Sequence, residues 1–136
     1  MSRHLAAAAA LAAIALPFAP MAGSTQPDTD SQAERIDRGE RLYRQTCSAC
    51  HSLDSNRVGP RHRGLFGRRA GSVEDYPYSR ALARSGLVWT SETLDAWLED
   101  PTGLVPGTAM GIRVRDPAAR AAIIAYLGSQ TENPAD

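Results

Sequence analysis

The sequence predicts a small all-α domain of three to five helices connected by long loops. Apolar residues recur at helical spacing in several stretches that begin with helix-capping residues, which is typical of amphipathic helices. No stretch shows the strict alternation of apolar and polar residues that is typical of a half-buried strand. The glycine- and proline-rich stretches 53–71 and 102–115 are expected to be loops. Because the chain is small, loops of this length need something to pack on.

Capping signals predict four helices. The first begins at a capping box, Ser31–Glu34, and runs into residue 47. The expected ranges of the others are 79–85, 90–100 and 116–128, with N-caps at Ser79, at Thr90 or Ser91, and at Asp116. Pro101 is expected to stop the third helix, and Pro117 occupies the first position of the last. Gly39 inside the first helix costs about 1 kcal/mol relative to Ala, so we expect another helix to approach closely there.

The start of the chain has the pattern of an export signal. Arg3 makes it basic, an apolar run extends from Leu5 to Leu16, and small residues follow at 19, 22 and 23. The run is shorter than the roughly 20 residues that a membrane-spanning helix needs, so stable membrane insertion is not expected. The expected division is a signal peptide at 1–23, a flexible leader at 24–33, one domain at 34–129 and a polar tail at 130–136.

Charge argues against a nucleic-acid partner. All 15 basic residues are arginines, and they are balanced by 15 acidic residues, so the general basic excess of a nucleic-acid-binding protein is missing. Five of the arginines lie in 57–69, which we interpret mainly as a solvated loop.

Cys47, Cys50 and His51 form a Cys-x-x-Cys-His motif, the attachment signature of a c-type haem. On a helical turn the two sulfurs point the same way, so both can form thioethers to one porphyrin, and His51 can then ligate the iron. A thioredoxin-type redox motif would need a strand–helix context instead of the helical one here. A zinc site would need a second pair of ligands, and a plain disulfide would leave His51 unexplained. One covalently attached haem c is therefore the expected cofactor.

Few residues can take the second axial position of the iron. Beyond the expected signal peptide, Met110 is the only methionine, His51 and His62 are the only histidines, and there is no lysine. The alternatives are Met110, His62, water or no ligand. Met110 is favoured because it follows Pro106–Thr108 in a loop, whereas a methionine that only fills a core mostly lies on a helix face. His62 is close to His51 in the arginine-rich loop and is interpreted as a wall or surface residue.

Several further stretches carry a family resemblance. They are Gly39–Tyr43, Val58–Pro60, Gly64–Arg68, Tyr78, Trp89, Val105–Met110 and Ile124–Leu127. With the haem motif, in this order and spacing, the sequence resembles class I cytochrome c of the mitochondrial and bacterial cytochrome c2 type. The resemblance implies the class I cytochrome c fold, with helices and long loops wrapped around one haem.

The resemblance also implies roles for individual residues. Gly39 and Tyr43 would cross the last helix at Tyr126, and the Pro60 carbonyl would accept a hydrogen bond from His51 Nδ1–H. The implied propionate partners are Arg68, Tyr78 and Trp89. On the distal side, Thr108 would order the loop of the ligand Met110, and Trp97 would line the haem pocket.

Four departures from the family pattern matter, and one of them is Leu82 in place of an asparagine that anchors a buried water. Trp97 stands where the family usually has a tyrosine that reaches the methionine sulfur, so we expect an altered Met–iron bond. His62 replaces an apolar wall residue, for which the sequence offers no physical reason. The family's ring of docking lysines is missing, so partner binding should depend less on salt unless arginines rebuild the ring.

The expected function is that of a soluble, monomeric, periplasmic one-electron carrier, not an enzyme. Its iron would be ligated by His51 and Met110, and two protein ligands leave no open site for a substrate. The expected partners are redox proteins such as a cytochrome bc complex, an oxidase, a reductase or a reaction centre. Two alternatives are a cytochrome subunit fixed to a dehydrogenase or reductase, and a haem protein with a labile distal ligand that acts as a peroxidase or gas sensor.

Overall fold

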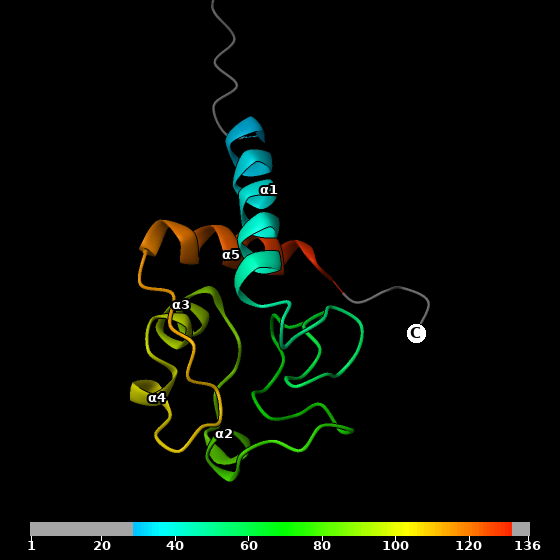
Figure 1. The fold of residues 1–136 in the computed structure, drawn as a ribbon, viewed down its shortest axis with the longest axis vertical. Coiled ribbons are helices and arrows are strands. Elements are labelled where there is room, and N and C mark those ends of the chain that lie inside the picture. Colours follow the sequence, from blue (N-terminus) through cyan, green and yellow to red (C-terminus); the bar gives the residue numbers. More distant parts are fainter. Residues whose placement is uncertain (1–28, 132–136) are drawn as a thin grey trace, which may run out of the picture.

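The computed structural model describes residues 29–131, with side chains from residue 32 onward. Its helices are α1 (Thr29–Thr46), α2 (Arg80–Arg84), α3 (Ser91–Glu99), α4 (Pro101–Leu104) and α5 (Pro117–Ser129) (Figure 1). Between residues 29 and 131 the only extended pairing is an isolated bridge of Arg69 with Val88. The all-α fold class is therefore confirmed, at the upper end of the expected number of helices.

Three of the predicted caps are present. Ser79 accepts a hydrogen bond from the Leu82 backbone at the start of α2, Thr90 forms a capping box with Thr93 at the start of α3, and Asp116 caps α5. These side chains satisfy backbone N–H groups that the first helical turn leaves without partners.

Helix bounds differ from the expectation at several helix ends. Helix α1 begins at Thr29, so Ser31 lies inside the helix and residues 29–33 of the expected leader are helical. Helix α3 ends at Glu99, because the Asp100 side chain caps a further short helix, α4, that the sequence did not predict. Helix α5 continues one residue past Gly128, to Ser129.

The first and last helices cross at a close contact, as expected. Helix α1 passes across α5 in Figure 1, and a Cβ atom on Gly39 would lie only 2.0 Å from the Ala122 carbonyl oxygen. Beside this point the Tyr43 and Tyr126 rings pack with their centroids 5.4 Å apart. Glycine is needed here because any side chain would force the two backbones apart.

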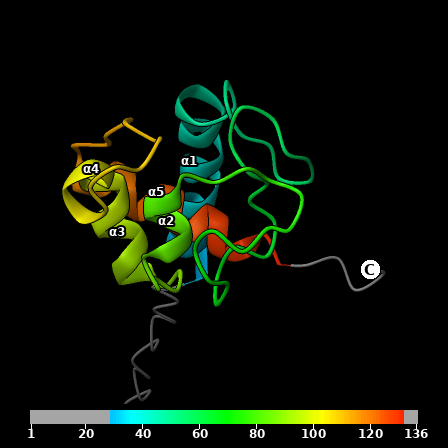
Figure 2. The same cartoon turned by 90° about the horizontal axis from the view of Figure 1, so that it is seen from below.

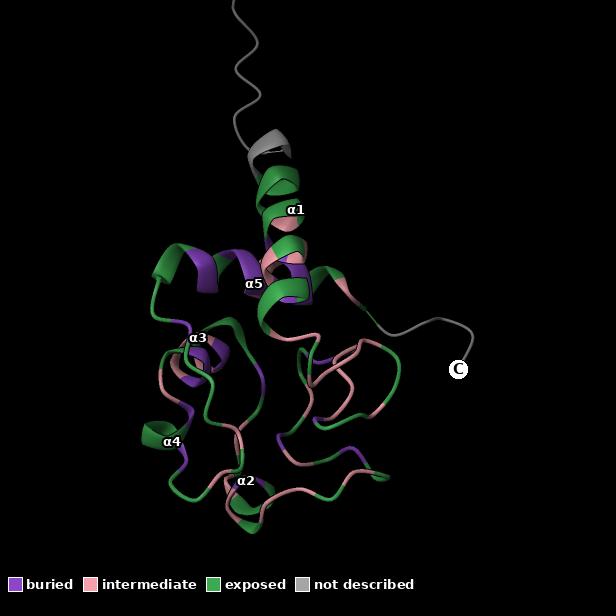
Figure 3. Cartoon of the chain, viewed as in Figure 1, coloured by how far each residue is buried: buried purple, intermediate pink, exposed green. Residues whose placement is uncertain are grey.

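The core is centred on α5, which packs against α1 at the crossing and against α3 further along the helix. Buried residues gather on α5, α3 and the facing side of α1, while the outer faces and loop edges are exposed (Figure 3). Helices α3 and α4 lie on one side of the molecule, and the long loop that follows α1 lies on the other, in both views (Figures 1 and 2). The haem-motif segment and the Met110 loop thus belong to opposite halves of the domain.

Candidate functional site

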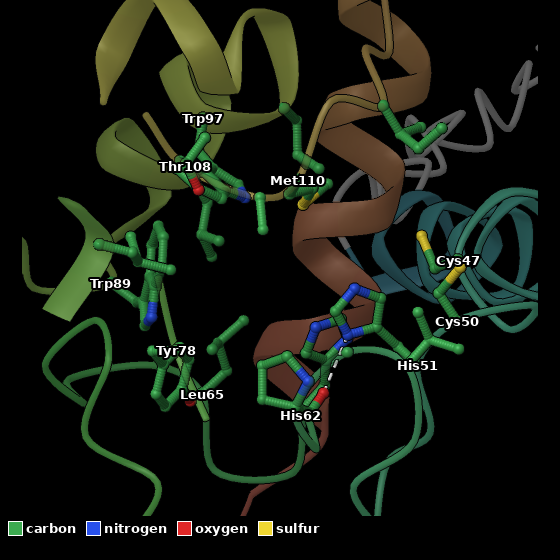
Figure 4. A pocket seen from close by; sticks show the side chains of 18 of the residues that line it. Cys47, Cys50, His51, His62, Leu65, Tyr78, Trp89, Trp97, Thr108 and Met110 are labelled. Atoms are coloured by element: carbon green, nitrogen blue, oxygen red, sulfur yellow. Dashed lines mark hydrogen bonds between the residues drawn. The ribbon is translucent and has the colours of Figure 1, made fainter. Parts of the chain in front are cut away.

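The Cys-x-x-Cys-His motif lies in a turn that directly continues α1. The His51 and Cys50 backbone N–H groups both donate to the Cys47 carbonyl, at 2.9 and 3.1 Å. Both cysteines are half-buried, and they form no disulfide with each other. Burial, and then the neighbouring Cys50, raise the pKa of the Cys47 thiol to about 11. Both cysteines line one cavity and lie on the same side of it in Figure 4.

The His51 ring is held by the segment that follows it. Its Nδ1 atom lies 2.9 Å from the Pro60 carbonyl oxygen, the contact that the family resemblance implied. Burial lowers the pKa of His51, and the Pro60 hydrogen bond opposes this shift. A neutral imidazole with Nδ1 engaged by a carbonyl has Nε2 available for a metal. Gly59 packs directly against the same ring, since a Cβ atom there would lie 2.2 Å from His51 Cε1.

Gly59→Ala is expected to shift the His51 ring and weaken its hydrogen bond to Pro60, because the added Cβ would also lie 2.5 Å from His51 Nδ1. A weaker hydrogen bond makes the imidazole a poorer electron donor to a bound iron, so the reduction potential should rise. A redox titration measures this. Gly111→Ala is the matched control, because a Cβ there meets nothing within 4 Å. Equal potentials for the two variants would contradict the prediction.

Met110 lies on the opposite side of the cavity, in the loop that follows α4. The Thr108 backbone N–H donates to the Val105 carbonyl at 3.1 Å, which closes a turn just before the methionine. Met110 is half-buried and lines the same cavity as His51. In Figure 4 these two side chains approach the space between them from opposite sides.

Two arginines hold the Met110 loop in place through ion pairs and hydrogen bonds. Arg113 pairs with Asp100 at 2.6 Å, and Asp100 also caps α4 by accepting from the Gly103 backbone. Arg120 on α5 is 6% exposed; it donates to the Val114 and Arg115 carbonyls and forms an ion pair with Asp95 on α3. Arg120 was not among the site residues expected from the sequence. The sequence feature that could have indicated it is a single arginine within the otherwise apolar run of the last helix.

The cavity that these residues share has a volume of about 420 Å³. Its walls are mainly apolar and include Leu65, Leu82, Leu94, Leu98, Val114, Ile123 and Leu127. Two thiols at one wall, an imidazole with a free Nε2 and a thioether opposite form a donor set that fits a covalently attached c-type haem. An apolar cavity also suits the macrocycle, which gains from leaving water.

The other expected pocket residues all line this cavity: Pro60, Arg68, Tyr78, Trp89, Trp97 and Thr108. The Arg68 guanidinium donates to the Arg61 and Arg63 carbonyls, at 2.9 and 3.0 Å, which fixes its position at the wall. Burial raises the pKa of Tyr78, so its hydroxyl stays protonated and can donate a hydrogen bond. The expectation that Arg68, Tyr78 and Trp89 donate hydrogen bonds to the haem propionates stays a prediction.

His62 lies in the cavity wall. Of the two positions expected for it, wall or surface, the structure has the first. Its ring stacks on His51 with centroids 4.1 Å apart, and its Nδ1 lies 3.1 Å from the Tyr43 hydroxyl. Burial, then His51 and Arg68, hold the pKa of His62 well below its usual value. No signal in the sequence indicated these contacts, because Tyr43, His51 and His62 meet only in the folded chain.

Comparisons with known proteins agree with this geometry. A family model described as cytochrome c matches residues 36–131. The cytochrome c2 iso-2 of Magnetospirillum fulvum is 44% identical over 86 residues, covering 61% of this chain and 90% of the relative. The cytochrome c2 of Afifella marina is 44% identical over 96 residues, covering 65% of this chain and 77% of the relative.

A solved structure gives the same result. Cytochrome cH from Methylobacterium extorquens superposes with a TM-score of 0.66 at 41% sequence identity, covering 69% of this chain and 97% of that protein. The family match extends over more than half of the chain and includes the haem motif, the Met110 loop and α5. The chain therefore belongs to the cytochrome c family, whose members carry a covalently attached c-type haem and transfer electrons.

Proposed function

We propose that the chain is a one-electron carrier in which His51 and Met110 ligate the haem iron on its two faces, with Cys47 and Cys50 as the thioether links. The supporting observation is one apolar cavity with His51 and the two thiols on one side and Met110 on the other. The haem supplies the one-electron redox couple. Ligation by histidine and methionine raises its potential, and two protein ligands leave no position for a substrate.

The surrounding residues have supporting parts in this proposal. Arg68, Tyr78 and Trp89 would hydrogen-bond the propionates from one end of the cavity, where Tyr78 and Trp89 lie together in Figure 4. Thr108 would order the Met110 loop. Trp97 is 6% exposed and packs edge-to-face on Trp89 with centroids 5.4 Å apart, so it would close the pocket to water. A dry pocket disfavours the additional charge of the oxidised iron.

We propose that the protein functions in the bacterial periplasm, after an export directed by residues 1–23. Those residues lie outside the described part of the chain. Membrane-bound or periplasmic redox proteins, such as a cytochrome bc complex, an oxidase, a reductase or a reaction centre, would be its partners. Helices long and apolar enough to cross a bilayer are not found among residues 29–131.

The first test is the optical spectrum of the oxidised protein together with a redox titration. The proposal expects a low-spin haem with the weak methionine-sulfur-to-iron charge-transfer band at the red end, and one reversible one-electron wave. A high-spin oxidised spectrum without that band would contradict it. Such a result would favour the alternative of an open iron, which draws support from the exposed positions of Ala109 and Gly111 on either side of Met110.

Electron transfer is expected to depend only weakly on salt, because three of the arginines that could replace a lysine ring are paired with carboxylates. Arg61 pairs with Asp75, Arg63 with Asp54 and Arg113 with Asp100. Paired charges produce little long-range attraction for salt to screen. The measurement is the bimolecular rate of oxidation by ferricyanide against ionic strength.

The control variant for this prediction removes the carboxylate partners of Arg61 and Arg63. The variant Asp54→Asn/Asp75→Asn should react faster with ferricyanide at low salt and should lose rate more steeply as salt is added. An equally steep fall in the unmodified protein would contradict weak electrostatic docking.

A further inference from the structure

Tyr43, His62 and His51 form a continuous chain of contacts between the α1–α5 crossing and the end of the haem motif. Tyr43 is 4% exposed and packs against Tyr126 of α5. Its hydroxyl lies 3.1 Å from His62 Nδ1, and the two rings meet edge to face at 67° with centroids 5.7 Å apart. His62 in turn stacks on His51 with an interplanar angle of 22°. Two directional contacts therefore separate a buried helix residue from the His51 ring.

Contacts with Pro60 and Gly59 leave part of the orientation of His51 undetermined. The hydrogen bond from Nδ1 to the Pro60 carbonyl fixes the position of one ring atom, at 2.9 Å. A single hydrogen bond of this kind still permits the ring to tilt about the line that joins its two atoms. Gly59 lies against three atoms of the ring and blocks movement of the ring toward the Gly59 backbone. A nearly parallel ring at 4.1 Å restrains the ring plane itself.

We propose that His62 is a positioning residue that sets the plane of the His51 imidazole, and that the Tyr43 hydroxyl holds His62 in place. This inference rests on the proposed role of His51 as the proximal ligand. It accounts for a polar ring at a wall position where an apolar side chain would fill the space. A leucine there would supply volume, but it would have neither a flat face for His51 nor a hydrogen-bonding atom for the Tyr43 hydroxyl.

The plane of an axial imidazole determines how unpaired spin spreads over an oxidised haem. The pattern of paramagnetically shifted haem methyl resonances in the proton NMR spectrum therefore reports the orientation of His51. A residue that only contributes to stability would change the denaturation midpoint without changing this pattern. The experiment compares holoprotein with the variants His62→Leu, Tyr43→Phe and Tyr43→Phe/His62→Leu. Tyr126→Phe is the matched control, since it removes a hydroxyl from the same ring cluster at a position away from His62.

Each variant has an expected outcome. His62→Leu should change the order or spread of the methyl shifts while the haem remains low-spin, and Tyr43→Phe should cause a smaller change in the same sense. The double variant should resemble His62→Leu alone, because the Tyr43 hydroxyl acts only through His62. Tyr126→Phe should leave the pattern of the unmodified protein.

Unchanged methyl shifts in His62→Leu, or a double variant whose change is the sum of the two single changes, would overturn the inference. If His62→Leu fails to assemble, Tyr43→Phe decides alone, since it removes one oxygen atom and keeps both rings: a pattern equal to that of Tyr126→Phe would overturn it. Failure of the proposed ligation would look different, because the unmodified protein would then lack a low-spin histidine–methionine spectrum.

Discussion

Met110→Ala is expected to convert the oxidised haem from low-spin to high-spin, remove the red charge-transfer band and lower the reduction potential. Met110 extends into the cavity from the side opposite His51 (Figure 4). A thioether ligand favours the reduced iron, so its loss removes the contribution that raises the potential. The spectrum and a redox titration measure both effects. Imidazole or cyanide added to the oxidised variant should also bind more readily than to the unmodified protein.

Ile112→Ala is the matched control for this variant. Ile112 is in the same loop, lines the same cavity and is 53% exposed, so its truncation should leave the spectrum low-spin. A low-spin oxidised spectrum in Met110→Ala would show that another group ligates the iron. His62 is a poor candidate for that group, because its ring lies beside His51 on the same side of the cavity.

Gly39→Ala is expected to cause the largest loss of stability among the substitutions considered. The new Cβ would lie 2.0 Å from the Ala122 carbonyl oxygen and 2.8 Å from Tyr126 Cβ. These are backbone or near-backbone atoms of α5, so the clash can be relieved only by moving the helices apart. Overpacking of a core costs about 1–3 kcal/mol, and this contact lies at the severe end of that range. Urea denaturation of the holoprotein, followed by circular dichroism, measures the change.

Gly128→Ala provides the comparison within α5. There the added Cβ would meet only the Phe66 ring, at 3.6 Å, which is an ordinary contact. Alanine is favoured over glycine in a helix by about 1 kcal/mol, so this variant should be as stable as the unmodified protein or more so. Equal denaturation midpoints for Gly39→Ala and Gly128→Ala would show that the helix crossing tolerates a side chain.

Much of the fold could be predicted because its signals are local. Ser79, Thr90 and Asp116 cap helices where expected, since a short polar side chain next to a free backbone N–H acts within one turn. The haem motif and the short list of candidates for the second axial position also needed only residue identities. Helix α4 escaped prediction because Pro101–Leu104 is too short for a periodic pattern and contains a glycine.

The sequence by itself determined the helical class, the haem attachment point and the small set of candidate ligands, because each of these depends on residue type and on spacing along the chain. Only the tertiary structure decided that Tyr43, His62 and His51 form one chain of contacts, and that Arg120 joins α5 to α3 and the Met110 loop. These contacts connect residues far apart in the chain. Their geometry depends on how α1, α5 and the loops pack together, and no local preference encodes that packing.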